Sequence, residues 1–397
     1  MKQLSDRLNK LSSSATLAMA QKSGELKAQG IDVISLSLGE PDFNTPEHIK
    51  QAAKKAIDEN YSHYSPVPGY LELRIAIAEK LKKENGVEYT PAQITCSNGA
   101  KQCVCNALMA LVNPGDEVIV PAPFWVSYPE MVKLAEGEPV VVVAGIEQDF
   151  KLKPEQLEAA ITSKTKALIL CSPSNPTGSV YTHDELKALA EVLEKHPQVY
   201  VISDEIYEHI NYVGRHESIA QFKGMQERTV IINGVSKAYA MTGWRLGFLA
   251  APEWIVKGCN KLQGQYTSGA SSIAQKAAEA AYTGTQQPVR DMKEAFMKRR
   301  DLIVRLAKEI PGIKVNNPQG AFYLFPDCSS FFGKSYNQHC IRTAEDLALF
   351  LLSEAHVACV GGTAFGAPEC IRMSYATSEE QIIEAMSRIK EALQKLK

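Results

Sequence analysis

The sequence lacks the features by which secreted, metal-binding and membrane-spanning proteins are commonly recognised. Its nine cysteines are an odd number and no two stand in C-x-x-C spacing, so we expect neither a disulfide framework nor a zinc site, and mostly buried thiols. No stretch approaches the roughly 18 apolar residues of a membrane span. The first residues carry charges and no apolar core, so we expect no signal peptide and a cytoplasmic protein.

An excess of charge of one sign is also lacking. Lys and Arg total 43 and Asp and Glu total 45, which leaves a formal charge of −2. A balance this close to zero argues against nucleic acid or a membrane surface as a partner. The content of 45% hydrophobic and 22% charged residues is typical of a globular protein, and 397 residues suffice for two or three domains.

Short apolar runs rich in Val, Ile and Leu alternate with helical patterns through the middle of the chain. The runs lie at 117–120, 140–144, 167–171, 199–203 and 229–233. Their lack of polar alternation is typical of strands that are buried on both faces. Between them, the sequence from Thr182 to Glu185 matches a capping box and predicts a helix start. The pattern predicts an α/β fold with a mostly parallel central sheet flanked by helices.

The pattern changes after about Gln287. A long charged helix is predicted over 290–309, strands within 311–327, a helix over 344–355, a strand over 371–375 and a final helix over 379–396. This order is typical of a smaller α+β domain, and it follows a large domain that spans 45–287. Two further helices are predicted near the start of the large domain, from Asn44 to about Asn60 and over 71–84.

Residues with chemically useful side chains follow several predicted strands, at the point where each strand ends. They are Gly99, Ala100 and Lys101 at a helix start, Trp125, Asn175 in a rigid turn, Asp204 and Tyr207, and Ser236, Lys237 and Arg245. The carboxyl ends of the strands are where ligands bind in open parallel sheets. Taken singly, each residue has an ordinary explanation, such as a helix cap, a turn residue or a surface lysine.

Together these residues supply the groups that a pyridoxal phosphate site requires. Lys237 is an amine that can react with an aldehyde, and Asp204 is a carboxylate for a ring nitrogen. Asn175 and Tyr207 can hydrogen-bond a phenolate, and Trp125 can stack on a ring. Free backbone N–H groups at a helix start can hold a phosphate.

At this point the chain resembles the class I aminotransferases of the aspartate aminotransferase family, and its bacterial branch in particular. The matching stretches are SLGEPDF (37–43), YSPVPG (64–69), SNPTG (174–178), SDEIY (203–207), SK (236–237) with GWR (243–245), and IRMSYA (371–376). They span nearly the whole chain in the family's order. The resemblance implies a pyridoxal-phosphate-dependent transferase of fold type I.

The resemblance also implies a role for each residue around the cofactor. Lys237 bonds covalently to the cofactor and later moves the substrate proton, while Asp204 pairs with the ring nitrogen. Asn175 and Tyr207 hydrogen-bond the phenolic oxygen, and Trp125 stacks on the ring. The phosphate is held by backbone N–H groups around Gly99, Ala100 and Lys101, by Ser236 and by Arg245, and Tyr64 reaches the phosphate of a neighbouring subunit. A homodimer with shared active sites is therefore implied.

For the substrate, the resemblance implies that Arg372 binds the α-carboxylate in bidentate fashion and that the Gly39 N–H assists it. These two residues must then meet, so the small domain is expected to comprise residues 1–44 and 288–397. Trp125 and Asn175 also contact substrate in such sites. The implied reaction passes an amino group from an amino acid to the cofactor and then to a second 2-oxo acid.

The identity of the substrate rests on three further residues. The stretch 265–269 has no arginine for a distal carboxylate, but Lys101, with the hydroxyls of Ser14 and Thr16, resembles the corresponding group of the bacterial branch. The alternative for Lys101 is a surface residue at a helix start, where cations are not favoured. Aspartate with 2-oxoglutarate is the first choice of substrates, and aromatic, alanine-type or prephenate substrates are the alternatives.

Three functions from other classes are less consistent with the sequence. A non-catalytic regulator on an aminotransferase-like body would need a DNA-binding module, for which the chain has no spare length or basic segment. A serine hydrolase elbow around Ser236 would need glycine where Ala238 stands. A nicotinamide-dependent dehydrogenase would need G-x-G-x-x-G after an early strand, and none is there.

Overall fold

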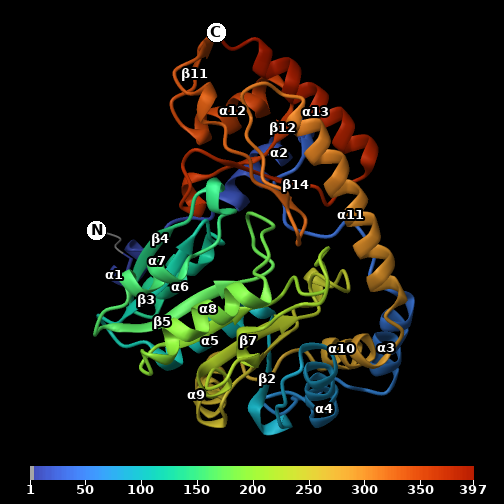
Figure 1. Cartoon of the computed structure of the whole chain (residues 1–397). Coiled ribbons are helices and arrows are strands. Elements are labelled where there is room, and N and C mark those ends of the chain that lie inside the picture. Colours follow the sequence, from blue (N-terminus) through green and yellow to red (C-terminus); the bar gives the residue numbers. More distant parts are fainter. Residues whose placement is uncertain (1–3) are drawn as a thin grey trace.

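The computed structural model describes residues 4–397 and is built around one seven-stranded sheet (Figure 1). In spatial order its strands are β2 (Ile94–Ser97), β8 (Gly247–Ala250), β7 (Thr229–Gly234), β6 (Tyr200–Asp204), β5 (Thr165–Cys171), β3 (Glu117–Ala122) and β4 (Glu138–Val143). Only β8 runs antiparallel to its neighbours in this sheet. The predicted α/β class with a mostly parallel sheet is confirmed.

The five predicted strands are all present, with two differences in detail. Strand β4 lies at the edge of the sheet, and Val141 and Val143 are 45% and 57% exposed. The prediction that this run is buried on both faces is therefore wrong, because an edge position leaves one side uncovered. The sequence does not predict β8. This strand has only four residues and begins at the last glycine of a Gly-Trp-Arg-Leu-Gly stretch, so it shows no clear hydrophobic periodicity.

Helices cover both faces of the sheet and bury its apolar side chains. One face packs against α5 (Ala100–Leu111), α6 (Ser127–Leu134) and α9 (Glu253–Tyr266). The other face packs against α7 (Pro154–Ala160) and α8 (His183–Glu194), and farther along against α3 (Glu47–Asp58), α4 (Leu71–Lys80) and α10 (Ser272–Thr283). The predicted capping box is confirmed at α8, where the Thr182 hydroxyl accepts the Glu185 N–H. The central strands are thus covered on both faces, which holds their carboxyl ends in place.

The long helix α11 (Gln287–Lys308) runs along one side of the molecule to its upper part (Figure 1). The upper part holds the three-stranded sheet of β13 (Val360–Gly361), β14 (Ile371–Ser374) and β9 (Tyr323–Leu324), with α12 (Ala344–Glu354) and α13 (Glu379–Gln394). A hairpin of β10 (Ser335–Tyr336) and β11 (His339–Cys340) is attached. Within the region predicted as strands, 311–327, only β9 is regular and the remainder is irregular chain.

Most of the N-terminal segment packs against this C-terminal part, whereas its first helix contacts α6 beside the large sheet. It contains α1 (Asp6–Asn9), α2 (Ala15–Ala28) and β1 (Ile34–Ser35), and β1 pairs in parallel with β12 (Val357–Ala358). This pairing brings residue 39 toward residue 372, as the predicted function requires. The division into domains at 45–287 and at 1–44 plus 288–397 stays a prediction, and residues 1–3 of it lie outside the described part.

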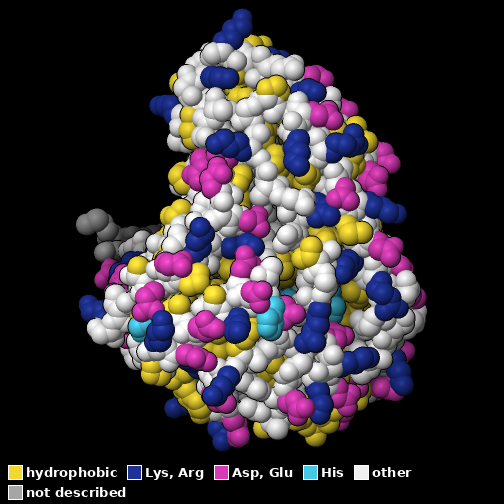
Figure 2. Space-filling view, in the orientation of Figure 1, with side chains coloured by type: hydrophobic (Ala, Val, Ile, Leu, Met, Phe, Trp, Pro, Cys, Tyr) yellow, Lys and Arg dark blue, Asp and Glu magenta, His cyan; other side chains and the backbone are white. Residues whose placement is uncertain are grey.

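Surface charge, helix apolarity and cysteine state describe the outside and the thiols of the molecule. Figure 2 shows acidic and basic side chains interspersed over the face in view, without a broad patch of one sign. None of the helices in residues 4–397 combines the length and apolarity needed to cross a bilayer. All nine cysteines are free thiols and six of them are buried, which confirms the prediction of mostly buried thiols.

Candidate active site

A cavity of about 330 Å³ opens between the large sheet and the C-terminal part. The residues that line it come from the carboxyl ends of β5, β6 and β7, the start of α5, the N-terminal segment and β14. Of the predicted site residues it brings together Ser14, Thr16, Gly39, Ala100, Lys101, Trp125, Asn175, Asp204, Tyr207, Ser236, Lys237, Arg245 and Arg372. Residues separated by up to 358 positions along the chain thus surround a single cavity, from Ser14 to Arg372.

Two predicted residues do not line the cavity. Gly99 is the N-cap of α5 with φ of +83°, and the Arg245 guanidinium occupies the space where a Cβ would be. It therefore lies directly behind the arginine rather than at the cavity surface. Tyr64 is 97% exposed, and its predicted role toward a neighbouring subunit stays a prediction.

Lys237 follows β7 and has the properties of an amine nucleophile. Its Nζ donates a hydrogen bond to the Gly39 carbonyl at 2.6 Å and lies 5.8 Å from the centre of the Tyr207 ring. Burial lowers the pKa of Lys237 to about 8; the positive charges of Arg372 and Arg245 act in the same direction, against an opposing effect of Glu40. An appreciable fraction of the amine is then neutral near pH 7 to 8, and the neutral form is the one that attacks a carbonyl carbon.

Asp204 is the last residue of β6 and is only 4% exposed. One carboxylate oxygen accepts the Tyr128 hydroxyl at 2.7 Å, and the other accepts the Ile206 N–H at 3.2 Å. Burial raises the pKa of Asp204 to about 6, although the Tyr128 hydrogen bond opposes this. A buried carboxylate with only neutral donors gains from a cationic partner in the cavity, such as a protonated ring nitrogen.

Arg372 on β14 is held by two hydrogen bonds and two aromatic rings. Its two Nη atoms donate to the Asn175 side-chain carbonyl at 2.9 Å and to the Ser37 backbone carbonyl at 2.7 Å. The guanidinium lies 4.7 Å from the Tyr323 ring centre and 4.9 Å from that of Phe365. Its Nε is a buried donor without a partner within residues 4–397. A guanidinium held in this way is prepared to bind a carboxylate without reorganising.

At the other end of the cavity, the groups suit a phosphate. Helix α5 starts at Ala100, so its first N–H groups are free to bind an anion. The Ser236 hydroxyl lines the cavity, and the Arg245 guanidinium is held by the carbonyls of Thr242 at 2.8 Å and Asn98 at 3.2 Å. An anion site, a buried amine, a buried carboxylate and the Trp125 indole together fit pyridoxal phosphate.

The residues predicted to bind a distal carboxylate also lie together. The Lys101 Nζ is 4.8 Å from the centre of the Trp125 ring, and Ser14 and Thr16 line the same cavity. Burial, with a contribution from the Arg245 charge, lowers the pKa of Lys101. Ser14 is the N-cap of α2 and accepts the Leu17 N–H at 3.4 Å, so its hydroxyl hydrogen is free for another partner.

The sequence missed two tyrosines that complete the site. Tyr128 lies one helical turn after Trp125, stacks edge-on against it with ring centres 5.3 Å apart, and holds Asp204. The Tyr323 hydroxyl is 2.7 Å from that of Tyr207, so it joins the cofactor side of the cavity to Arg372. The three-residue spacing of Trp125 and Tyr128 at the start of α6 is a signal that could have identified Tyr128. Tyr323 lies within 311–327, where β9 is the one regular strand.

The chain is similar to known aminotransferases in both sequence and structure. Residues 31–389 match the family model described as aminotransferase class I and II. An aspartate/prephenate aminotransferase from Cereibacter sphaeroides is 51% identical over 97% of both chains, and an aspartate aminotransferase from Bacillus subtilis is 48% identical over 99% of both. The crystal structure of the aspartate aminotransferase from Rhizobium meliloti superposes with a TM-score of 0.97 at 43% identity, covering 100% of both chains.

Proposed function

The chain belongs to the class I and II aminotransferase family, and we propose that it transfers the amino group of aspartate to 2-oxoglutarate in two half-reactions. The family implies dependence on pyridoxal phosphate, and the cavity fits that group. The observation that supports the acidic substrate is the placement of Lys101, Ser14 and Thr16 in the same cavity as Lys237 and Arg372. Two relatives that are named aspartate aminotransferase, with 48% and 49% sequence identity to this chain, support it as well.

Around the cofactor, the proposed roles follow from the contacts described above. When bound, pyridoxal phosphate supplies an aldehyde that takes up the amino group and a ring that withdraws electrons from the substrate Cα. Lys237 holds the cofactor covalently, and its free amine then moves the proton at the substrate Cα. Asp204 keeps a proton on the ring nitrogen. Asn175 and Tyr207 donate hydrogen bonds to the phenolic oxygen.

Arg372 is proposed to bind the substrate α-carboxylate, with the Gly39 N–H beside it. We expect Arg372→Leu to raise the KM for aspartate and to lower kcat/KM by the equivalent of about 2–5 kcal/mol, because a buried charge pair is lost. Steady-state kinetics with aspartate measures this loss. Arg342→Leu is the matched control, because the Arg342 side chain is 77% exposed on the surface. Unchanged kcat/KM in the Arg372 variant would refute the assignment.

Lys101 is proposed to meet the distal carboxylate of the substrate. Its side chain is separate from its backbone N–H, so Lys101→Ala leaves the phosphate site at the start of α5 intact. We expect kcat/KM for aspartate to fall by about 1.5–3 kcal/mol, or roughly 10- to 150-fold, with little change for alanine. Equal losses for aspartate and alanine would show that Lys101 does not recognise the distal carboxylate.

Prephenate is a second candidate as amino acceptor, because the relative from Cereibacter sphaeroides is named an aspartate/prephenate aminotransferase. The enzyme would then take the amino group from aspartate and pass it to prephenate in the second half-reaction. Adding prephenate to the aminated enzyme and recording the return of the cofactor absorption tests this directly. Return at the same rate as in buffer alone would exclude it.

A homodimer with shared active sites, a division into a large and a small domain and a cytoplasmic location complete the proposal. An exposed tyrosine at position 64 and exposed Leu4, Leu8 and Leu17 near the N-terminus support contact with a second copy. Sedimentation of the holoenzyme at micromolar concentration distinguishes a dimer from a monomer.

A further inference from the structure

The turn that follows β6 sends its side chains in two opposite directions. Asp204 and Tyr207 line the cofactor cavity, whereas Glu205 and Glu208 are absent from its lining. Both glutamates are nonetheless buried, and Glu205 is only 1% exposed. Buried carboxylates are costly unless they are fully partnered, so their contacts show what they do.

Glu205 connects three parts of the chain, two through its carboxylate and one through its backbone. One oxygen accepts the Ser203 hydroxyl at 2.9 Å and the Ser218 hydroxyl at 2.6 Å, and the other lies 2.9 Å from His216 Nε2. Its backbone N–H also donates to the Ile232 carbonyl of β7 at 2.8 Å. The residue directly after Asp204 is therefore attached to its own strand, to the neighbouring strand and to the loop at 216–218.

His216 is the titratable partner of Glu205 in this group. Burial alone lowers the pKa of His216, but the negative charges of Glu205 and Glu208 outweigh burial and the opposing charge of Lys80, so the pKa is raised. The imidazole is then protonated over a wider pH range than a free histidine. When His216 is protonated, its hydrogen bond to Glu205 is charge-assisted, and such bonds are stronger and geometrically stricter than neutral ones.

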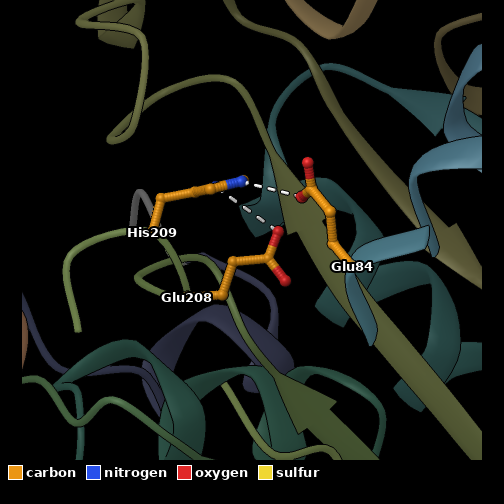
Figure 3. A group of neighbouring side chains, drawn as sticks. All are labelled: Glu84, Glu208 and His209. Carbon is orange, nitrogen blue, oxygen red and sulfur yellow. Dashed lines mark hydrogen bonds and ion pairs between the residues drawn. The ribbon is translucent and has the colours of Figure 1, made fainter. Parts of the chain in front are cut away.

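Glu208 provides a second attachment, one turn further along. Figure 3 shows the His209 ring pointing toward Glu84, with a second contact to Glu208; the Nε2 of His209 is 3.0 Å from the Glu84 carboxylate. Glu208 forms an ion pair with Lys80, and its other oxygen accepts the Asn85 side-chain N–H at 2.7 Å. Glu84, Glu208 and His209 carry groups that also bind metal ions, and these groups lie within reach of one another. Here the Lys80 ammonium already forms ion pairs with both carboxylates, so the cluster is better understood as an anchor.

We propose that Glu205 is a positioning residue for transamination: from behind the turn, its contacts with Ser203, Ser218 and His216 hold Asp204 and Tyr207 in the direction of the cofactor. Glu208 holds the far end of the same turn against α4 and the residues that follow it. The inference rests on the proposed roles of Asp204 and Tyr207. In this proposal, the directions of the Asp204 and Tyr207 side chains depend on the contacts of Glu205 as well as on β6 and the cavity.

Glu205→Gln in the full-length protein tests the proposal, because glutamine has the same shape and lacks the charge. We expect cofactor affinity and kcat each to fall by about 10- to 100-fold, with KM for aspartate nearly unchanged, since the substrate carboxylates are bound elsewhere. Melting temperatures of apoenzyme and holoenzyme supply a readout without turnover. The rise in Tm on adding cofactor is expected to shrink, because ligand stabilisation follows its dissociation constant.

Glu217→Gln is the matched control. Glu217 lies in the same loop, but it pairs at the surface with His183. If Glu205→Gln lowers the Tm of apoenzyme and holoenzyme equally and leaves cofactor affinity intact, the residue is merely structural and the proposal is wrong. If the variant does not fold, Ser218→Ala removes one of the three donors and is expected to weaken cofactor binding, whereas unchanged binding would overturn the proposal. Failure of the wild-type protein to bind cofactor would instead refute the proposed function.

Discussion

Replacing Lys237 by alanine is expected to abolish turnover, with kcat reduced by a factor on the order of 10⁴ or more. The expected loss is this large because the proposed function assigns to one side chain both the covalent bond to the cofactor and the proton transfer at the substrate Cα. Among residues 4–397, Lys101 is the one other lysine that lines the cavity, and it lies by the Trp125 ring. Steady-state transamination of aspartate measures the effect, with the exposed Lys54→Ala as the control.

The covalent bond can be tested independently of turnover. Borohydride reduces such a bond and makes it permanent, so digestion and peptide mapping then identify the lysine that carries the cofactor. We expect the label on the peptide that contains Lys237 in the wild-type protein and no labelled peptide in Lys237→Ala. A label on another lysine, or turnover in the variant, would contradict the assignment.

Replacing Asp204 by alanine is expected to produce the second large effect. The Asp204 carboxylate is buried, its pKa is raised to about 6 by that burial, and its neighbours Tyr128 and Ile206 are neutral donors. The proposed partner of this carboxylate is a cationic ring nitrogen. Without the carboxylate the ring is neutral and withdraws electrons poorly, so we expect loss of the Cα proton to slow by about 3–4 kcal/mol and cofactor affinity to fall.

Exchange of the substrate Cα hydrogen with deuterated solvent measures this step directly. Asp204→Asn is the informative companion variant, because it keeps the shape and an oxygen for the Tyr128 hydroxyl but removes the charge. We expect it to resemble Asp204→Ala in rate and to differ in stability, since the alanine leaves the buried Tyr128 hydroxyl unpaired. Exchange at the wild-type rate with cofactor bound would show that the charge on Asp204 is not needed.

Much of the site was predictable from sequence for a simple physical reason. Parallel strands end at the same edge of a sheet, so Asn175, Asp204 and Lys237 come together once the strands are recognised. The apolar runs that form these strands are short and continuous, and such runs give a clear signal. An apolar run does not show whether its strand lies at the centre or at the edge of the sheet. The sequence therefore predicts a strand buried on both faces at 140–144, where the edge strand β4 lies.

The parts that were missed depend on contacts between distant segments. Tyr323 contacts Tyr207 and Arg372 only because β9 pairs with β14, and no local pattern indicates that pairing. Asp204 ends β6 and Glu205 follows it, and only the family resemblance, not the strand pattern, singles out Asp204 as the carboxylate that faces the cavity. Their directions follow from packing partners on other elements, such as Tyr128 for the former and His216 for the latter.

A panel of single half-reactions is the most direct measurement of the central claim, that this cavity aminates its cofactor from dicarboxylic amino acids. The holoenzyme is mixed with aspartate, glutamate, alanine, tyrosine or phenylalanine, and the loss of the absorption of the bound cofactor is followed in each case. The account predicts rapid loss with aspartate and glutamate and much slower loss with alanine. Loss that is fastest with alanine or an aromatic amino acid would contradict the proposed substrate, and no loss with any amino acid would contradict transamination itself.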